Sequence, residues 1–172
     1  NIICQTSTNP GFESTIGGGT LNCIRSAPNS TVGGGRSNKV TGSGSTTCAN
    51  TIGGGSTNTI GNSCCGVIGG GYNNQVGTAC FVFIGGGASN CIDRACCSGI
   101  LAGCGNKICV GHHKSFIVGN NIVSCTTCTT YVNNLRVNGT LSKSGGSFSI
   151  DHPDPAKTKT HRLVHGFVES AT

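Results

Sequence analysis

The chain has 172 residues and a formal net charge of +6, yet only 9% of its residues are charged and 5% are aromatic. Its 11 Lys and Arg residues form no cluster, which argues against nucleic-acid binding, because that function needs grouped cations. No apolar run approaches the roughly 20 residues of a membrane-spanning helix, and no signal peptide is visible. The chain begins at Asn1 rather than Met, which predicts a fragment or a processed product.

Gly-Gly-Gly triplets recur along the chain at a regular spacing. They begin at Gly17, Gly33, Gly53, Gly69 and Gly85, in steps of 16, 20, 16 and 16 residues. Continuing the 16-residue step places Leu101-Ala102-Gly103 and Ile117-Val118-Gly119 in the same slot. The single long step predicts an enlarged turn around residues 41–45. A short, fixed period is typical of solenoids and fibres.

Two columns of aliphatic residues accompany the triplets and predict a core. The first column precedes each triplet: Ile16, Val32, Ile52, Ile68, Ile84, Ile100 and Phe116. The second lies eight residues further on: Ile24, Val40, Ile60, Val76, Ile92 and Ile108. β-branched residues favour strands, and consecutive glycines disfavour a helix. We therefore predict an all-β fold, a parallel β-roll or β-solenoid with 16-residue coils of two short strands and two turns each.

Asn recurs five residues after the first Gly of each triplet. The members of this column are Asn22, Asn38, Asn58, Asn74, Asn90 and Asn106. We expect their side chains to stack in a hydrogen-bonded ladder rather than to bind a ligand. A phosphate-binding loop is not expected, because the triplets lack the Lys-Ser or Lys-Thr and the helix that such loops need.

The 13 cysteines follow the same repeat. One column contains Cys48, Cys64, Cys80, Cys96 and Cys128, with His112 in the coil that lacks a Cys, and the next position contains Cys65, Cys97 and His113. Disulfides, a metal site and an inert apolar ladder all remain open. The disulfide candidates are Cys48, Cys64, Cys65, Cys80, Cys96 and Cys97, and His112 and His113 are weak candidates for a metal. No cofactor is expected. The vicinal pairs predict bridges between chains, if a turn brings both cysteines to a chain–chain seam.

The composition changes near residue 130, where the period fades. Half of the 16 charged residues lie between Arg136 and Thr172. We predict a lead-in over residues 1–14, a repeat shaft over 15–130, neck strands over 131–150 and a cap or stub over 151–172. Asp151, Asp154 and Glu169 are expected to be solvated charges of the cap rather than catalytic groups. Asn29 and Asn138 begin glycosylation sequons.

Two sequence patterns resemble a known family. Residues 139–155 read Gly-Thr-Leu-Ser-Lys-Ser-Gly-Gly-Ser-Phe-Ser-Ile-Asp-His-Pro-Asp-Pro, and residues 165–170 read His-Gly-Phe-Val-Glu-Ser. This motif resembles one near the ends of viral and phage fibre-like proteins, although a Leu is missing before Asp154 and Gly166 replaces a Ser. The Ile-Gly-Gly-Gly-x-x-Asn-x-Ile repeat resembles trimeric autotransporter adhesin heads and giant-virus or phage fibre shafts.

The resemblance implies an extracellular homotrimer that projects from a virion or cell and contacts a receptor or glycan on a host surface. We therefore expect a structural fibre or adhesin subunit, not an enzyme. Two alternatives stay open. A tailspike-like carbohydrate-cleaving enzyme would need paired carboxylates. The shaft has only Glu13 and Asp93, which lie far apart, but Asp151, Asp154 and Glu169 could cluster. An ice-binding solenoid would need a flat Thr array, which Thr15, Thr31 and Thr51 begin and Val67 and Phe83 interrupt.

Overall fold

The computed structural model describes residues 1–4, 13–43, 49–140, 148–151 and 162–165. The chain divides into two compact units, Asn1–Leu135 and Arg136–Thr172. Every regular element in the described ranges is a β-strand, which confirms the all-β prediction. No helix in this part of the chain is long and apolar enough to cross a membrane.

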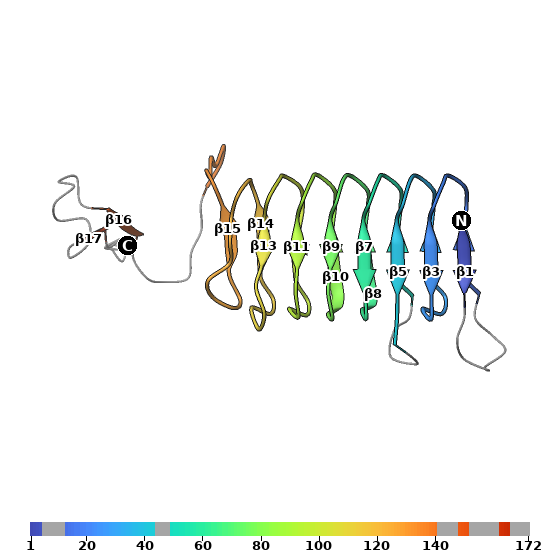
Figure 1. Cartoon of the computed structure of the whole chain (residues 1–172). Coiled ribbons are helices and arrows are strands. Elements are labelled where there is room, and N and C mark those ends of the chain that lie inside the picture. The colour runs from blue at the N-terminus through green and yellow to red at the C-terminus, as the bar shows by residue number, and fades with distance from the viewer. Residues whose placement is uncertain (5–12, 44–48, 141–147, 152–161, 166–172) are drawn as a thin grey trace. The chain divides into compact units, whose positions relative to one another are not determined.

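The first unit is a parallel β-solenoid, whose coils follow one another in a row in Figure 1. Sheet A has seven strands: β1 (Ile2–Cys4), β3 (Cys23–Arg25), β5 (Lys39–Thr41), β7 (Thr59–Gly61), β9 (Gln75–Val76), β11 (Cys91–Ile92) and β13 (Lys107–Ile108). Sheet B has eight: β2 (Thr15–Ile16), β4 (Thr31–Val32), β6 (Thr51–Ile52), β8 (Cys64–Ile68), β10 (Cys80–Ile84), β12 (Gly99–Ile100), β14 (Phe116–Val118) and β15 (Thr130–Val132). From β1 to β14 successive strands alternate between the sheets, so one coil contributes one strand to each, and β15 follows β14 in sheet B.

Both aliphatic columns point between the two sheets. In sheet A, Val40 pairs with Ile60, and in sheet B, Ile52 pairs with Ile68, so each column stays in register from coil to coil. The largest fully buried side chains of the core are Ile24, Val32, Val40, Ile52, Ile60, Ile68, Val76, Ile84, Ile92, Ile100, Ile108 and Ile117. Ile16, in the terminal strand β2, is partly buried and packs against this cluster.

The glycine triplets form the turn that leads from sheet B back to sheet A. The third glycine of each triplet has a positive φ, for example 82° at Gly55. A Cβ on Gly55 would collide with the backbone carbonyl of Gly71 in the next coil, whereas a Cβ on Gly54 would meet nothing within 4 Å. The period therefore reflects close backbone stacking at one edge of the solenoid.

The Asn column forms the expected ladder beside these glycines. The Nδ2 group of Asn58 donates to the carbonyl oxygens of Gly54 and Gly71 at 3.0 and 2.9 Å, so the side chain ties its own triplet to the next one. The same amide donates to Oδ1 of Asn38 at 3.1 Å. The Asn side chains thus hold the glycine turns together.

The first coil begins earlier than the sequence predicts. Residues 1–14 were expected as a lead-in, but β1 pairs in parallel with β3, and Ile3 lies opposite Ile24. Asn1 joins the ladder, since its Oδ1 accepts the N–H of Asn22 and its Nδ2 donates to the carbonyl of Gly18. The sequence did not predict this strand, because the step from Ile3 to Ile24 is longer than the 16-residue period.

The predicted phase is wrong by one residue in the coil after Ile100. Ile100 pairs with Ile117, not with Phe116, so the step in sheet B is 17 residues. Ile117 is fully buried, whereas the side chain of Phe116 is 42% exposed. An extra residue in the preceding turn causes the shift.

The second unit contains an antiparallel pair, β16 (Phe148–Asp151) and β17 (Arg162–His165). The pair extends across the expected boundary between neck and cap at residue 150. Residues 133–140 form no strand. Asp154, Glu169 and most of the motif that resembles fibre proteins lie outside the described residues.

Candidate functional site

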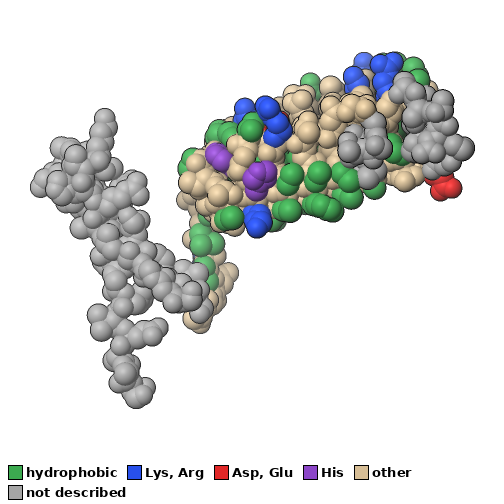
Figure 2. Space-filling model, turned by 90° about the horizontal axis from the view of Figure 1, so that it is seen from below, with side chains coloured by type: hydrophobic (Ala, Val, Ile, Leu, Met, Phe, Trp, Pro, Cys, Tyr) green, Lys and Arg blue, Asp and Glu red, His purple; other side chains and the backbone are tan. Residues whose placement is uncertain are grey.

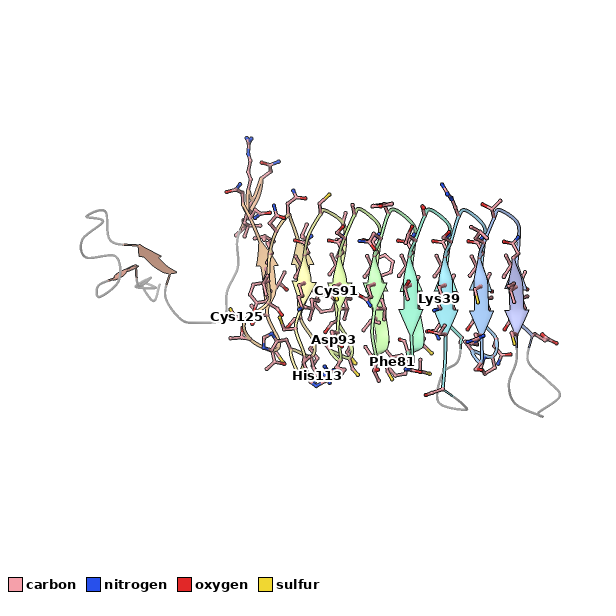
Figure 3. All side chains as sticks on the ribbon, viewed as in Figure 1. Lys39, Phe81, Cys91, Asp93, His113 and Cys125 are labelled. Atoms are coloured by element: carbon pink, nitrogen blue, oxygen red, sulfur yellow. The ribbon has the colours of Figure 1, made fainter. Side chains whose placement is uncertain are left out.

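Most of the cysteines in the middle of the chain line one edge of the solenoid, where the chain passes from sheet A to sheet B. We call this edge the thiol ridge and define it as Cys64, Cys65, Cys80, Phe81, Cys96, Cys97, His113 and Lys114. Figure 2 views the solenoid from this side and shows a row of side chains of the hydrophobic class, which includes Cys, with His side chains nearby. Figure 3 shows Phe81 and His113 projecting at the same lower edge.

The ridge has an inner and an outer column, one residue apart. Cys64 and Cys80 of the inner column pair in register, and the N–H of Cys97 in the outer column donates to the carbonyl of Cys80 at 3.0 Å. Outer-column residues have left-handed backbone, with φ of 54° at Cys65 and 57° at Cys97. This conformation turns both cysteines of a vicinal pair toward the edge, instead of alternating them between the faces of a strand.

The thiols of the ridge contact one another within a coil and the backbone of the neighbouring coil. The Sγ atoms of Cys64 and Cys65 are 3.8 Å apart. The N–H of Cys80 donates to Sγ of Cys96 at 3.3 Å. The 12 described cysteines form no disulfide with one another, and the predicted bridges between chains stay a prediction.

Two ridge thiols have raised pKa values. The hydrogen bond with Cys64 is the largest cause for the thiol of Cys65, and burial adds to it. Burial is the main cause of the raised pKa of Cys80, and a hydrogen bond from the backbone of Cys64 in the preceding coil partly opposes this rise. A raised pKa reduces the thiolate fraction at neutral pH and therefore the reactivity of these two cysteines. Cys97, by contrast, is an exposed thiol.

The two His residues occupy different slots from those predicted. His113, not His112, follows Cys96 in the inner column, because the N–H of Cys96 donates to Nδ1 of His113 at 2.9 Å. Nδ1 of His112 contacts Oγ of Ser124 at 2.7 Å. Lys114 follows Cys97 in the outer column, and Cys128, predicted in the inner column, comes next in the outer one, where its N–H donates to the carbonyl of His113. No group of three or more His, Cys, Asp or Glu that could hold a metal occurs among the described residues.

The outer face of sheet B has a second distinctive surface, an apolar band that extends from β8 to β14. We define this apolar band as Val67, Phe83, Leu101, Phe116 and Val118. Phe83 is 44% exposed and Phe116 42%. A Cβ added at Gly99 would lie 3.1 Å from the ring of Phe116, so this ring rests on the glycine that separates the two aromatic residues. Sequence reasoning missed the band, because it placed Phe116 in the core.

The outer face of sheet A differs from this band in charge. Its strands carry Arg25, Lys39 and Lys107, whereas no described strand of sheet B carries a charged residue. Lys39 and Cys91 lie on this face in Figure 3. The sequence alone did not distinguish the charged outer face of sheet A from the uncharged outer face of sheet B, because residue spacing does not show which side of each strand meets solvent.

The remaining candidates do not gather into one site. Glu13 precedes β2 and Asp93 follows β11, many coils apart, and Asp93 instead makes an exposed ion pair with Arg94 at 3.3 Å. Thr15, Thr31 and Thr51 pair in register, but Val67 continues their column. Both sequon residues, Asn29 and Asn138, are exposed. Cys48 lies outside the described residues.

Comparison with known proteins gives no relative on which to base a function. No protein-family model matches the chain, and no curated protein matches it.

Proposed function

We propose that this chain is a shaft segment of an extracellular, homotrimeric attachment fibre, which contacts a receptor or glycan on a host surface. The observation that supports it best is an uninterrupted parallel solenoid with one uncharged, partly apolar outer face. A solenoid gains length simply by adding coils, each about 4.8 Å further along the axis. Such a body suits a spacer that holds a contact site away from a surface.

The apolar band supplies a reason for chains to associate. The aliphatic columns are already buried within one chain, so association is not required to form a core. Phe83, Phe116 and Leu101 nevertheless remain exposed on sheet B. In a closed trimer, three sheet-B faces around the axis would remove this surface from water, while the cations of sheet A stay in solvent. Like charges would then not meet at the interface.

Sedimentation velocity and negative-stain electron microscopy of the full chain test the assembly. We expect a trimer with an elongated shape, and a stable folded monomer at micromolar concentration would contradict the homotrimer. Incubation with a panel of complex glycans and with host-type cell membranes tests attachment. Binding of the chain to a glycan or a membrane without any released sugar supports a fibre, whereas release of sugar products would establish an enzyme instead.

A further inference from the structure

The thiol ridge has the same order of side chains in both directions. Along its outer column, Cys65, Phe81 and Cys97 occupy three successive coils, and along its inner column Cys64, Cys80 and Cys96 do so. The central coil, with Cys80 and Phe81, is therefore flanked on both sides by a Cys-Cys pair. Such a pattern is self-complementary under a twofold axis through the central coil and perpendicular to the solenoid axis.

We propose that the thiol ridge is a covalent docking surface for a second copy of this chain, in which Cys65 of each chain forms a disulfide with Cys97 of the other across an antiparallel interface. Phe81, which is 65% exposed, lies on the twofold axis and packs against its copy. Cys65 and Cys97 are each one coil from Phe81, so the same rotation brings both pairs into opposition. Every position of the ridge other than Phe81 faces a different position of the second chain, as a twofold axis through Phe81 requires.

Charge selects the antiparallel arrangement over a parallel one. Lys114 follows Cys97 in the outer column and is exposed, and Ala49 lies one coil before Cys65 at the other end. In the antiparallel arrangement Lys114 faces Ala49 of the other copy. In a parallel ridge-to-ridge arrangement Lys114 would face its own copy, and like charges placed opposite each other at an interface are unfavourable.

The local geometry allows the bridges. Both cysteines have left-handed backbone in the outer column, so both extend from the edge, and Cys97 is exposed. Adjacent coils are spaced at about 4.8 Å, so Cys65 and Cys97 of one chain are about 9.6 Å apart, too far for a bridge to each other, which needs Cα atoms within about 4.4–6.8 Å. A bridge between Cys65 and Cys97 therefore needs two chains.

Oxidised glutathione, a small disulfide, serves as the oxidant. The Cys97 thiolate attacks one glutathione sulfur, the S–S bond breaks, and one glutathione thiolate leaves. The Cys65 thiolate of the second chain then attacks Sγ of Cys97 and releases the other glutathione thiolate. Each bridge thus transfers two electrons to glutathione, and the two protons of the protein thiols end on the two reduced glutathione molecules.

Isotope-mixed oxidation tests the proposal on the full chain. Reduced natural-abundance and ¹⁵N-labelled chains are mixed in equal amounts, oxidised with oxidised glutathione, blocked with N-ethylmaleimide and digested. Trypsin cleaves after Arg94, between the two cysteines. We expect cross-linked peptides that join Cys65 to Cys97 with one light and one heavy partner. Bridges that join Cys97 to Cys97, bridges only within one isotope, or no bridge would each overturn the proposal.

Matched serine variants separate the outer column from the inner one. Cys97→Ser should abolish the covalent dimer on non-reducing electrophoresis, whereas Cys96→Ser should retain it, because a serine hydroxyl can still accept the N–H of Cys80. Circular dichroism confirms that both variants keep the fold. A covalent dimer that survives Cys97→Ser would overturn the proposal. The result does not depend on the proposed trimer, which sedimentation of the reduced chain reports separately.

Discussion

Asn74 donates both its backbone N–H and its side-chain Nδ2 to Oδ1 of Asn58 in the preceding coil, at 3.0 and 3.1 Å. Both residues are fully buried. One carbonyl oxygen therefore satisfies two donors of the next coil, while the Nδ2 group of Asn58 satisfies glycine carbonyls on either side. The ladder fulfils the hydrogen-bonding needs of turns that are buried against one another.

Asn58→Ala should destabilise the solenoid by roughly 2–5 kcal/mol, because it leaves the buried backbone N–H of Asn74 without its acceptor and removes the bonds that Nδ2 donates to the carbonyls of Gly54 and Gly71. The measurement is chemical denaturation followed by circular dichroism. Gln75→Ala serves as the control, since Gln75 is exposed on the next coil and should change the free energy of unfolding little. Equal stability of the two variants would show that the ladder contributes little.

Gly55→Ala should cost roughly 2–5 kcal/mol, since it adds a strained positive φ and a Cβ that collides with the Gly71 carbonyl. Gly54→Ala is the matched control, because its Cβ meets no atom within 4 Å. Ala102 already stands in the middle position of a later turn. Thermal unfolding of the two variants measures the difference, and similar melting temperatures would contradict the stacked-backbone explanation.

Ile68→Asp should prevent folding or cost several kcal/mol, because it places an unpaired carboxylate in a fully buried column. Gln75→Asp introduces the same charge on the exposed face of sheet A and should leave the melting temperature nearly unchanged. An unchanged melting temperature for Ile68→Asp would remove this residue from the core.

Phe83→Asp should dissociate the proposed trimer while the chain stays folded, because three carboxylates would meet where an exposed aromatic ring now lies. Lys39→Asp, on the outer face of sheet A, is the control and should leave the assembly intact. Sedimentation equilibrium of both variants decides the outcome. A trimer that persists in Phe83→Asp places the interface elsewhere.

Cys91 should react with iodoacetamide more slowly than Cys97 near neutral pH. Burial raises the pKa of the Cys91 thiol, an effect that Lys107 partly opposes, so less thiolate is present below the raised pKa. As the pH rises through that value the two rates should converge, apart from the lower accessibility of Cys91. Peptide mapping of labelled protein at several pH values checks this, and equal rates at neutral pH would contradict it.

The raised pKa of Cys91 should also make the folded state less stable at alkaline pH. The folded state holds the Cys91 proton more tightly than the unfolded chain does. The stabilisation from this thiol is therefore fully present below the pKa of the unfolded chain, and it is lost as the pH rises through the pKa of the folded state. Alkaline destabilisation should therefore be smaller in Cys91→Ser than in the unchanged chain. Denaturation midpoints measured at neutral and alkaline pH test this.

The sequence by itself determined the period, the two aliphatic columns and the Asn ladder. These features depend on neighbouring coils that repeat one pattern, so the identity of a residue and its spacing suffice to place it. The parallel sheets follow, because equal steps bring equivalent residues of successive coils side by side. The structural role of the glycine triplets could be predicted for the same reason, since the same close backbone contact recurs at each triplet.

Only the tertiary structure decided where this regularity is interrupted and which way the side chains point. The step from Ile100 to Ile117 gains a residue in a turn that contains no buried apolar residue to mark the phase, so Phe116 lies on the surface and not in the predicted core. Ile3 was similarly separated from its partner Ile24 by an inserted segment. The left-handed backbone at Cys65 and Cys97 recurs in the outer column at Phe81 and Lys114, and the spacing of residue types along the chain does not reveal it. That conformation, not the spacing of the cysteines, places both members of each vicinal pair on one edge.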